Sequence, residues 1–183
     1  MPESFPWEIV GVQDMPAAAD AEVFVGERRW NVQRPQVLVV CCSDGRLQEC
    51  MDEFLQERMG VHHYDRFYAP GGPGALAISG YEFLRAEQYR DDCAFLLRAH
   101  GVQDLILIFH GPAPDGPEEA VCAHYRRILP HATPEQIRAQ QAQDMEEVLT
   151  YLKILRLPVR VHGFRAEVLP SRQVRFAPLT EDQ

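Results

Sequence analysis

Four residues carry side chains that could act together on a metal ion or a small substrate: Cys42, Asp44, Arg46 and His110. A cysteine thiolate and a histidine imidazole are ligands that suit zinc, and zinc lowers the pKa of a bound water to about 7. Arg46 follows Asp44 closely, so its guanidinium can hold that carboxylate ionised and oriented through charge-assisted hydrogen bonds. If the fold brings them together, Cys42 and His110 could bind a metal ion beside this charged pair.

These residues follow apolar segments that are typical of buried strands. Residues 35–42 form a continuous apolar run with β-branched side chains, and residues 104–109 form a second run that stops at His110. Apolar residues at helical spacing alternate with such runs, which predicts an α/β fold with a largely parallel central sheet flanked by helices. We expect strands at residues 35–42, 64–69, 104–109, 159–164 and 174–176, and helices at 47–59, 75–100 with a break near 91–92, 117–129 and 134–155. Ligands of such sheets bind at the carboxyl ends of the strands, where Cys42 and His110 would lie.

Two local patterns refine this outline. The glycine-rich segment 70–74 contains Pro73, which has no N–H, and it lacks the known phosphate-binding spacings, so we expect it to shape a nearby site. Thr133 and Gln136 form the pattern of a capping box, with Pro134 in the first turn, which predicts where the last helix begins.

Length, charge and cysteine content bound the possible classes of protein. The 183 residues can bury one core, so we expect a single domain at residues 35–183 behind an N-terminal arm, residues 1–34, that could lie at a dimer interface. The net charge of −9 argues against nucleic-acid binding, and no apolar run is long enough for a membrane span. The first residues do not resemble a signal peptide, and five cysteines make a poor disulfide framework. These features predict a soluble cytoplasmic protein.

The segment Cys42-Ser43-Asp44-Gly45-Arg46 resembles the Cys-x-Asp-x-Arg motif of β-carbonic anhydrases. Three further segments resemble the glycine-bearing loop, the second ligand strand and a late strand of that family: residues 68–72, 105–110 and 161–164. The likeness covers roughly residues 35–178 and is greatest to the small bacterial members of the family.

The resemblance implies a zinc lyase that interconverts carbon dioxide and bicarbonate, works as a homodimer, and uses Asp44 and Arg46 in catalysis. In that family zinc is bound by the cysteine of the first motif and by both ends of a His-x-x-Cys motif. Here His110 is present, but Ala113 stands where the second cysteine belongs, and alanine cannot bind metal. The expected ligands are therefore Cys42 and His110, with Asp44 as the third.

Another cysteine could replace the missing thiolate, although we favour neither of the two candidates. Cys122 falls within the predicted helix 117–129, and Cys41 should point to the opposite face of its strand from Cys42.

Simpler interpretations also stay open. Cys42 could be a small core residue, Asp44 with Arg46 a turn-stabilising ion pair, and His110 only a hydrogen-bonding residue. The alternative hypothesis is therefore a catalytically inactive family relative, a metal-free binding or regulatory protein that could bind a small anion near Arg46.

Overall fold

A computed structural model of the chain describes residues 25–78 and 82–179. The chain divides into two units, residues 1–33 and 34–183, and each is described by itself. In the first unit, residues 25–33 are exposed and form neither helix nor strand. Most of the expected arm, residues 1–34, lies outside the described residues, so its place at a dimer interface stays a prediction.

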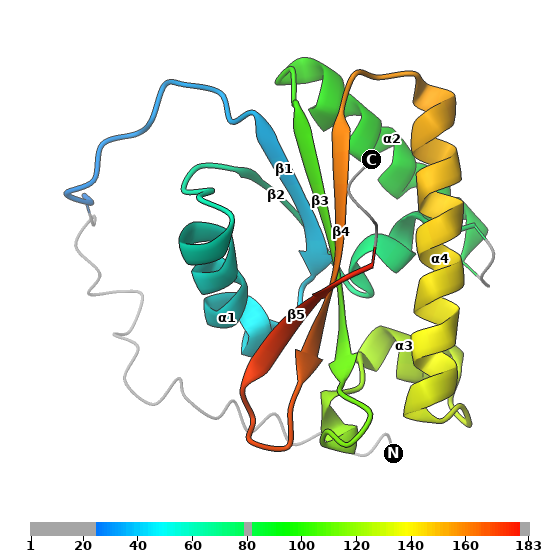
Figure 1. Ribbon diagram of the computed structural model, residues 1–183. Helices are drawn as coiled ribbons and strands as arrows, with labels where there is room; N and C mark the ends of the chain where they lie inside the picture. The colour runs from blue at the N-terminus through cyan, green and yellow to red at the C-terminus, as the bar shows by residue number, and fades with distance from the viewer. Residues whose placement is uncertain (1–24, 79–81, 180–183) are drawn as a thin grey trace, which may run out of the picture. The chain divides into compact units, whose positions relative to one another are not determined.

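A five-stranded sheet forms the centre of the second unit, with the strand order β2-β1-β3-β4-β5 (Figure 1). Neighbouring strands are parallel from β2 to β4, and β5 pairs antiparallel with β4. The strands are β1 Val37–Cys42, β2 Asp65–Ala69, β3 Asp104–Pro112, β4 Arg160–Val168 and β5 Val174–Pro178. The predicted α/β fold with a largely parallel sheet is confirmed.

Helices cover both faces of this sheet, as Figure 1 shows, with α1 on one side and α2, α3 and α4 on the other. The α-helices are α1 Gln48–Glu53, which continues as a π-helix over Phe54–Arg58, α2 Phe83–Ala99, α3 Ala123–Ile128 and α4 Pro134–Leu155. Short 3-10 turns occupy Gly45–Leu47, Gly72–Leu76 and Glu118–Ala120. In the described part of the chain, no helix combines the length and the apolar character that crossing a membrane requires.

The alternation of side chains along β1 divides the core into two clusters. Val40 and Cys42 pack toward α2, α3 and α4, whereas Val39 and Cys41 pack toward α1. Because successive side chains of a strand point to opposite faces, Cys41 is turned away from Cys42, as predicted.

Several boundaries differ from the predicted ones, and among the strands β4 and β5 extend to Val168 and Pro178. The helix α2 begins only at Phe83 and runs without a break through Asp91 and Asp92, which its exposed face accommodates. The strand β3 continues through His110 to Pro112, because the equally long β4 extends the pairing to Pro112 opposite Val168. The predicted helix 117–129 is instead a 3-10 turn followed by α3.

The beginning of α4 agrees with the sequence. The Thr133 Oγ1 accepts a hydrogen bond from the Gln136 N–H, and the Gln136 side chain accepts one from the Thr133 N–H. This is the predicted capping box, with Pro134 in the first turn.

Candidate metal centre

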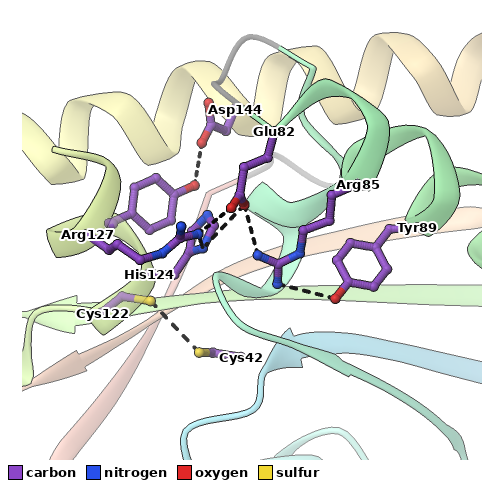
Figure 2. A network of polar contacts seen from close by, with 9 residues as sticks. Cys42, Glu82, Arg85, Tyr89, Cys122, His124, Arg127 and Asp144 are labelled. Carbon is purple, nitrogen blue, oxygen red and sulfur yellow. Dashed lines mark hydrogen bonds and ion pairs between the residues drawn. The ribbon is translucent and has the colours of Figure 1, made fainter. Parts of the chain in front are cut away.

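Three metal-binding side chains meet at the carboxyl ends of β1 and β3. Cys42 is the last residue of β1, His110 lies near the end of β3, and Cys122 is the N-cap residue of α3. One potential ligand atom from each lies within 4.8 Å of the others, and all three residues are buried. The Cys42 and Cys122 Sγ atoms are 3.8 Å apart and face each other in Figure 2.

The donor set and its geometry fit a zinc ion. Two thiolates bound to tetrahedral zinc at about 2.3 Å lie about 3.8 Å from each other, close to the separation of the two Sγ atoms. The His110 Nε2 is buried and, among the described residues, has no hydrogen-bond partner. A buried imidazole nitrogen without a partner is costly unless it binds something, and a metal would satisfy it. Two cysteines and one histidine would leave one coordination position open, as catalytic zinc sites do.

The two thiols have opposite electrostatic environments. The contact with the Cys122 thiol lowers the pKa of Cys42, and His110 acts in the same direction against the effect of burial. The pKa of Cys122 is raised, first by that contact with Cys42 and then by burial. Cys42 is therefore the member of the pair that favours the thiolate form, which is the form that binds metal.

The glycine-rich segment after β2 packs directly on the backbone of Cys42. Gly72 has a φ of +59°, and a Cβ at this position would lie 2.9 Å from the Cys42 backbone nitrogen. Gly71 likewise leaves room for the ring of His124, whose Cδ2 would lie 2.6 Å from an added Cβ. The segment shapes the wall of the donor cluster, in line with the sequence-based expectation.

Gly72→Ala should therefore destabilise the protein more than Gly60→Ala. Both positions have positive φ, +59° and +68°, but an added Cβ at Gly60 meets nothing within 4 Å. Each variant carries the strain of a left-handed alanine, about 1 kcal/mol, and Gly72→Ala adds a backbone clash of roughly 1–3 kcal/mol. Urea unfolding of the two variants measures this difference. Equal losses of stability would show that the loop moves freely away from Cys42.

A buried polar network holds the backbone of His110 in place. The Gln141 Nε2 donates a hydrogen bond of 3.0 Å to the His110 carbonyl, and Arg165 donates one to the Gln141 Oε1. Gln141 comes from α4 and Arg165 from β4, and their exposed fractions are 1% and 2%. Sequence reasoning missed both residues, because neither belongs to a motif.

Asp44 and Arg46 form a bidentate ion pair beside the donor cluster. The Arg46 Nε and Nη2 donate to the Asp44 carboxylate at 2.9 and 2.6 Å, and the Arg46 backbone N–H donates to the same group at 3.1 Å. These hydrogen bonds lower the pKa of Asp44, with a smaller contribution from His110. The carboxylate is thus ionised at neutral pH and oriented by Arg46.

A cleft of about 170 Å³ leads to this site. Its lining combines polar groups with apolar side chains: Asp44, Arg46, Leu47, Cys50, His110, Pro117, Glu119, Ala120, Val168, Arg172 and Val174. The cleft therefore gives a small molecule access to His110 and Asp44 together.

A second group of polar residues connects the beginning of α2 to α3 near the two cysteines, as Figure 2 shows. Glu82 accepts hydrogen bonds from Arg85 and Arg127, and its carboxylate lies 4.0 Å from the His124 Nδ1. Because Glu82 is already neutralised, we interpret this group as support for the beginning of α3, where Cys122 lies.

The structure brings together Cys42 and His110, as predicted, and adds Cys122. Asp44 lies next to them, but it binds Arg46 and is not part of the three-residue donor cluster, so its role as a metal ligand stays a prediction. Ala113 is buried and donates its N–H to the Val168 carbonyl, which extends the contact between β3 and the end of β4. Cys122 reaches the cluster because α3 begins at Ala123, after it, and not at residue 117 as predicted.

The chain was compared with protein-family models, curated proteins and solved structures. No protein-family model matches this chain, and no curated protein matches its sequence. Similar solved structures include β-carbonic anhydrase isoform I of Trichomonas vaginalis, which is 14% identical over 85% of this chain and 88% of that chain, with a TM-score of 0.44.

Two further solved structures are similar to this chain. A carbonic anhydrase of Glaciozyma antarctica is 16% identical over 82% of this chain and 85% of that chain, with a TM-score of 0.46. The β-carbonic anhydrase CafA of Aspergillus fumigatus is 18% identical over 81% and 78%, with a TM-score of 0.42.

Proposed function

We propose that this protein catalyses the zinc-dependent reversible hydration of carbon dioxide, with Cys42, His110 and Cys122 as the zinc ligands. The observation that carries the proposal is the convergence of these three buried donors, of which His110 lines the same cleft as the Asp44–Arg46 pair. The resemblance to the Cys-x-Asp-x-Arg motif supports the choice of reaction. Cys122 would supply the thiolate that Ala113 does not.

Zinc, when bound here, supplies the Lewis acidity that makes water nucleophilic toward carbon dioxide at neutral pH. The residues of the chain provide the rest. The ionised Asp44 can accept a hydrogen bond from a water molecule in the cleft and so orient it, while Arg46 fixes the carboxylate in one position. Apolar walls from Leu47, Ala120 and Val168 suit an uncharged, linear substrate.

In this proposal Asp44 keeps its ion pair with Arg46 and orients a water molecule in the cleft, and it does not bind the metal. If Asp44 were the third zinc ligand, its carboxylate would have to leave its hydrogen bonds from the Arg46 side chain and backbone. Cys122 needs no such rearrangement, which is why we prefer it.

We further propose that the protein works as a homodimer in the cytoplasm. All five cysteines are free, and two of them are the proposed ligands, so the site requires a reducing compartment. Size-exclusion chromatography with light scattering tests the dimer.

The proposed function is tested by metal analysis and stopped-flow carbon dioxide hydration on protein purified without chelator. We expect about one zinc per chain, and we expect Asp44→Asn to lower kcat/KM about a hundredfold while the zinc content stays constant. Asp104→Asn is the matched control, because Asp104 also binds an arginine, Arg160, but lies at the opposite end of β3. Protein without zinc and without hydration activity would instead support the metal-free binding protein.

A further inference from the structure

Two arginines from distant parts of the chain converge on Glu119 at the cleft. The Arg46 Nη1 donates a hydrogen bond of 3.2 Å to the Glu119 backbone carbonyl. The Arg172 Nη2 lies 2.8 Å from the Glu119 Oε1. All three residues line the cleft, so the Glu119 carboxylate and the Arg172 guanidinium meet at its wall.

Arg172 occupies a backbone position that favours glycine. It lies in the turn between β4 and β5, where its N–H donates to the Leu169 carbonyl, and its φ is +69°. The hydrogen bonds of this turn are those of a type I turn followed by one left-handed residue, a position that glycine occupies without strain. The turn therefore does not require a long side chain at Arg172. The guanidinium that this position directs to the cleft gives a functional reason for the arginine.

The ion pair between Arg172 and Glu119 is weak enough for another anion to replace the Glu119 carboxylate. Their side chains are 68% and 58% exposed, and ion pairs between such exposed groups are weak. The arginine fork matches a planar group with two oxygens and one negative charge, which is what the glutamate side chain presents to it. Glu119 thus occupies the position that a small planar oxyanion would take.

We propose that Arg172 binds a small planar, carboxylate-like oxyanion in the cleft, in exchange for the Glu119 side chain. Bicarbonate has this shape and charge, so on the proposed function the anion is the product of hydration or the substrate of the reverse reaction. Arg172 would hold it while Asp44 and Arg46 keep their own ion pair. Arg172 would then be a specificity-determining residue supplied by the β4–β5 turn.

The experiment measures the binding of acetate, a planar carboxylate that a hydration reaction does not consume, to the full zinc-saturated chain. The protein is titrated into carboxyl-labelled acetate at pH 7, and the 13C linewidth of the acetate is followed. Unlabelled bicarbonate is then added as a competitor. We expect Arg172→Gly to weaken acetate binding about tenfold, since it removes a charged hydrogen-bond donor and relieves the backbone. Glu119→Gln should strengthen binding by about two- to fivefold, since it removes the internal competitor.

Arg156→Gly is the matched control. Arg156 also has a positive φ, +51°, but it ends α4 and does not line the cleft, and its replacement removes the same charge. Unchanged acetate binding in Arg172→Gly would overturn the proposal, as would equal losses in Arg172→Gly and Arg156→Gly, which indicate general charge attraction. Bicarbonate that fails to displace acetate would also overturn it. Because acetate binding is measured without turnover, these outcomes are separate from the presence or absence of hydration activity.

Discussion

Cys122→Ala is expected to reduce the zinc content from about one per chain to nearly none and to abolish carbon dioxide hydration. The variant leaves Cys42 and His110 as the only members of the donor cluster, and catalytic zinc sites use three protein ligands. Elemental analysis after dialysis measures the zinc, and stopped-flow hydration measures the activity. Cys93→Ala is the matched control, because Cys93 is also a buried free cysteine but lies in α2, outside the cluster.

The same experiment can be extended to the residue that the family resemblance singles out. Adding Ala113→Cys to the Cys122→Ala chain should restore no zinc, because the Ala113 N–H is fixed on the Val168 carbonyl and Gly116 packs against its backbone. Full zinc binding by Cys122→Ala alone would exclude Cys122 as a ligand and return Asp44 to that place.

Glu167→Gln is expected to lower the free energy of unfolding by about 3–5 kcal/mol, the usual cost of removing one partner from a buried ion pair. Glu167 is 3% exposed, and its carboxylate lies 2.8 Å from Arg138, 2.5 Å from Arg175 and 3.6 Å from Arg165. Burial, together with the charge of Arg138, already lowers the pKa of Arg165 to about 10. Without Glu167, that buried guanidinium would lose its negative partner.

Urea unfolding at pH 7 measures this effect, with Glu118→Gln as the control. Glu118 also binds an arginine, Arg126, but its side chain is 75% exposed, so its replacement should cost less than about 1 kcal/mol. Because Arg165 also holds Gln141 under the His110 carbonyl, Glu167→Gln should weaken zinc binding as well. Equal stability of the two variants would mean that water reaches Arg165 and replaces the carboxylate.

The fold could be predicted because its main determinants are local in sequence. The apolar runs before Cys42 and His110 form β1 and β3, and the Thr133 capping box begins α4. Cys42 and His110 could be placed in the site by the same reasoning, since residues at the carboxyl ends of adjacent parallel strands must lie close together.

The positions of Cys122 and Gln141 depend on where the loops run and on how the helices pack. The sequence predicts one helix over residues 117–129 that includes Cys122, whereas α3 begins only after Cys122. Gln141 has the appearance of a surface residue on a polar helix, and only the packing of α4 on β3 shows that it binds the His110 carbonyl. Neither fact can be deduced from spacing along the chain.

The distance between the two cysteines along the chain has a consequence for how the protein matures. Cys42 and Cys122 are 80 positions apart, and they meet only when β1, β3 and α3 have assembled. Contacts of such long range form late, because the entropy of closing the intervening loop must be overcome first. Zinc would therefore bind at the end of folding. It would stabilise the assembled domain in addition to its part in the reaction.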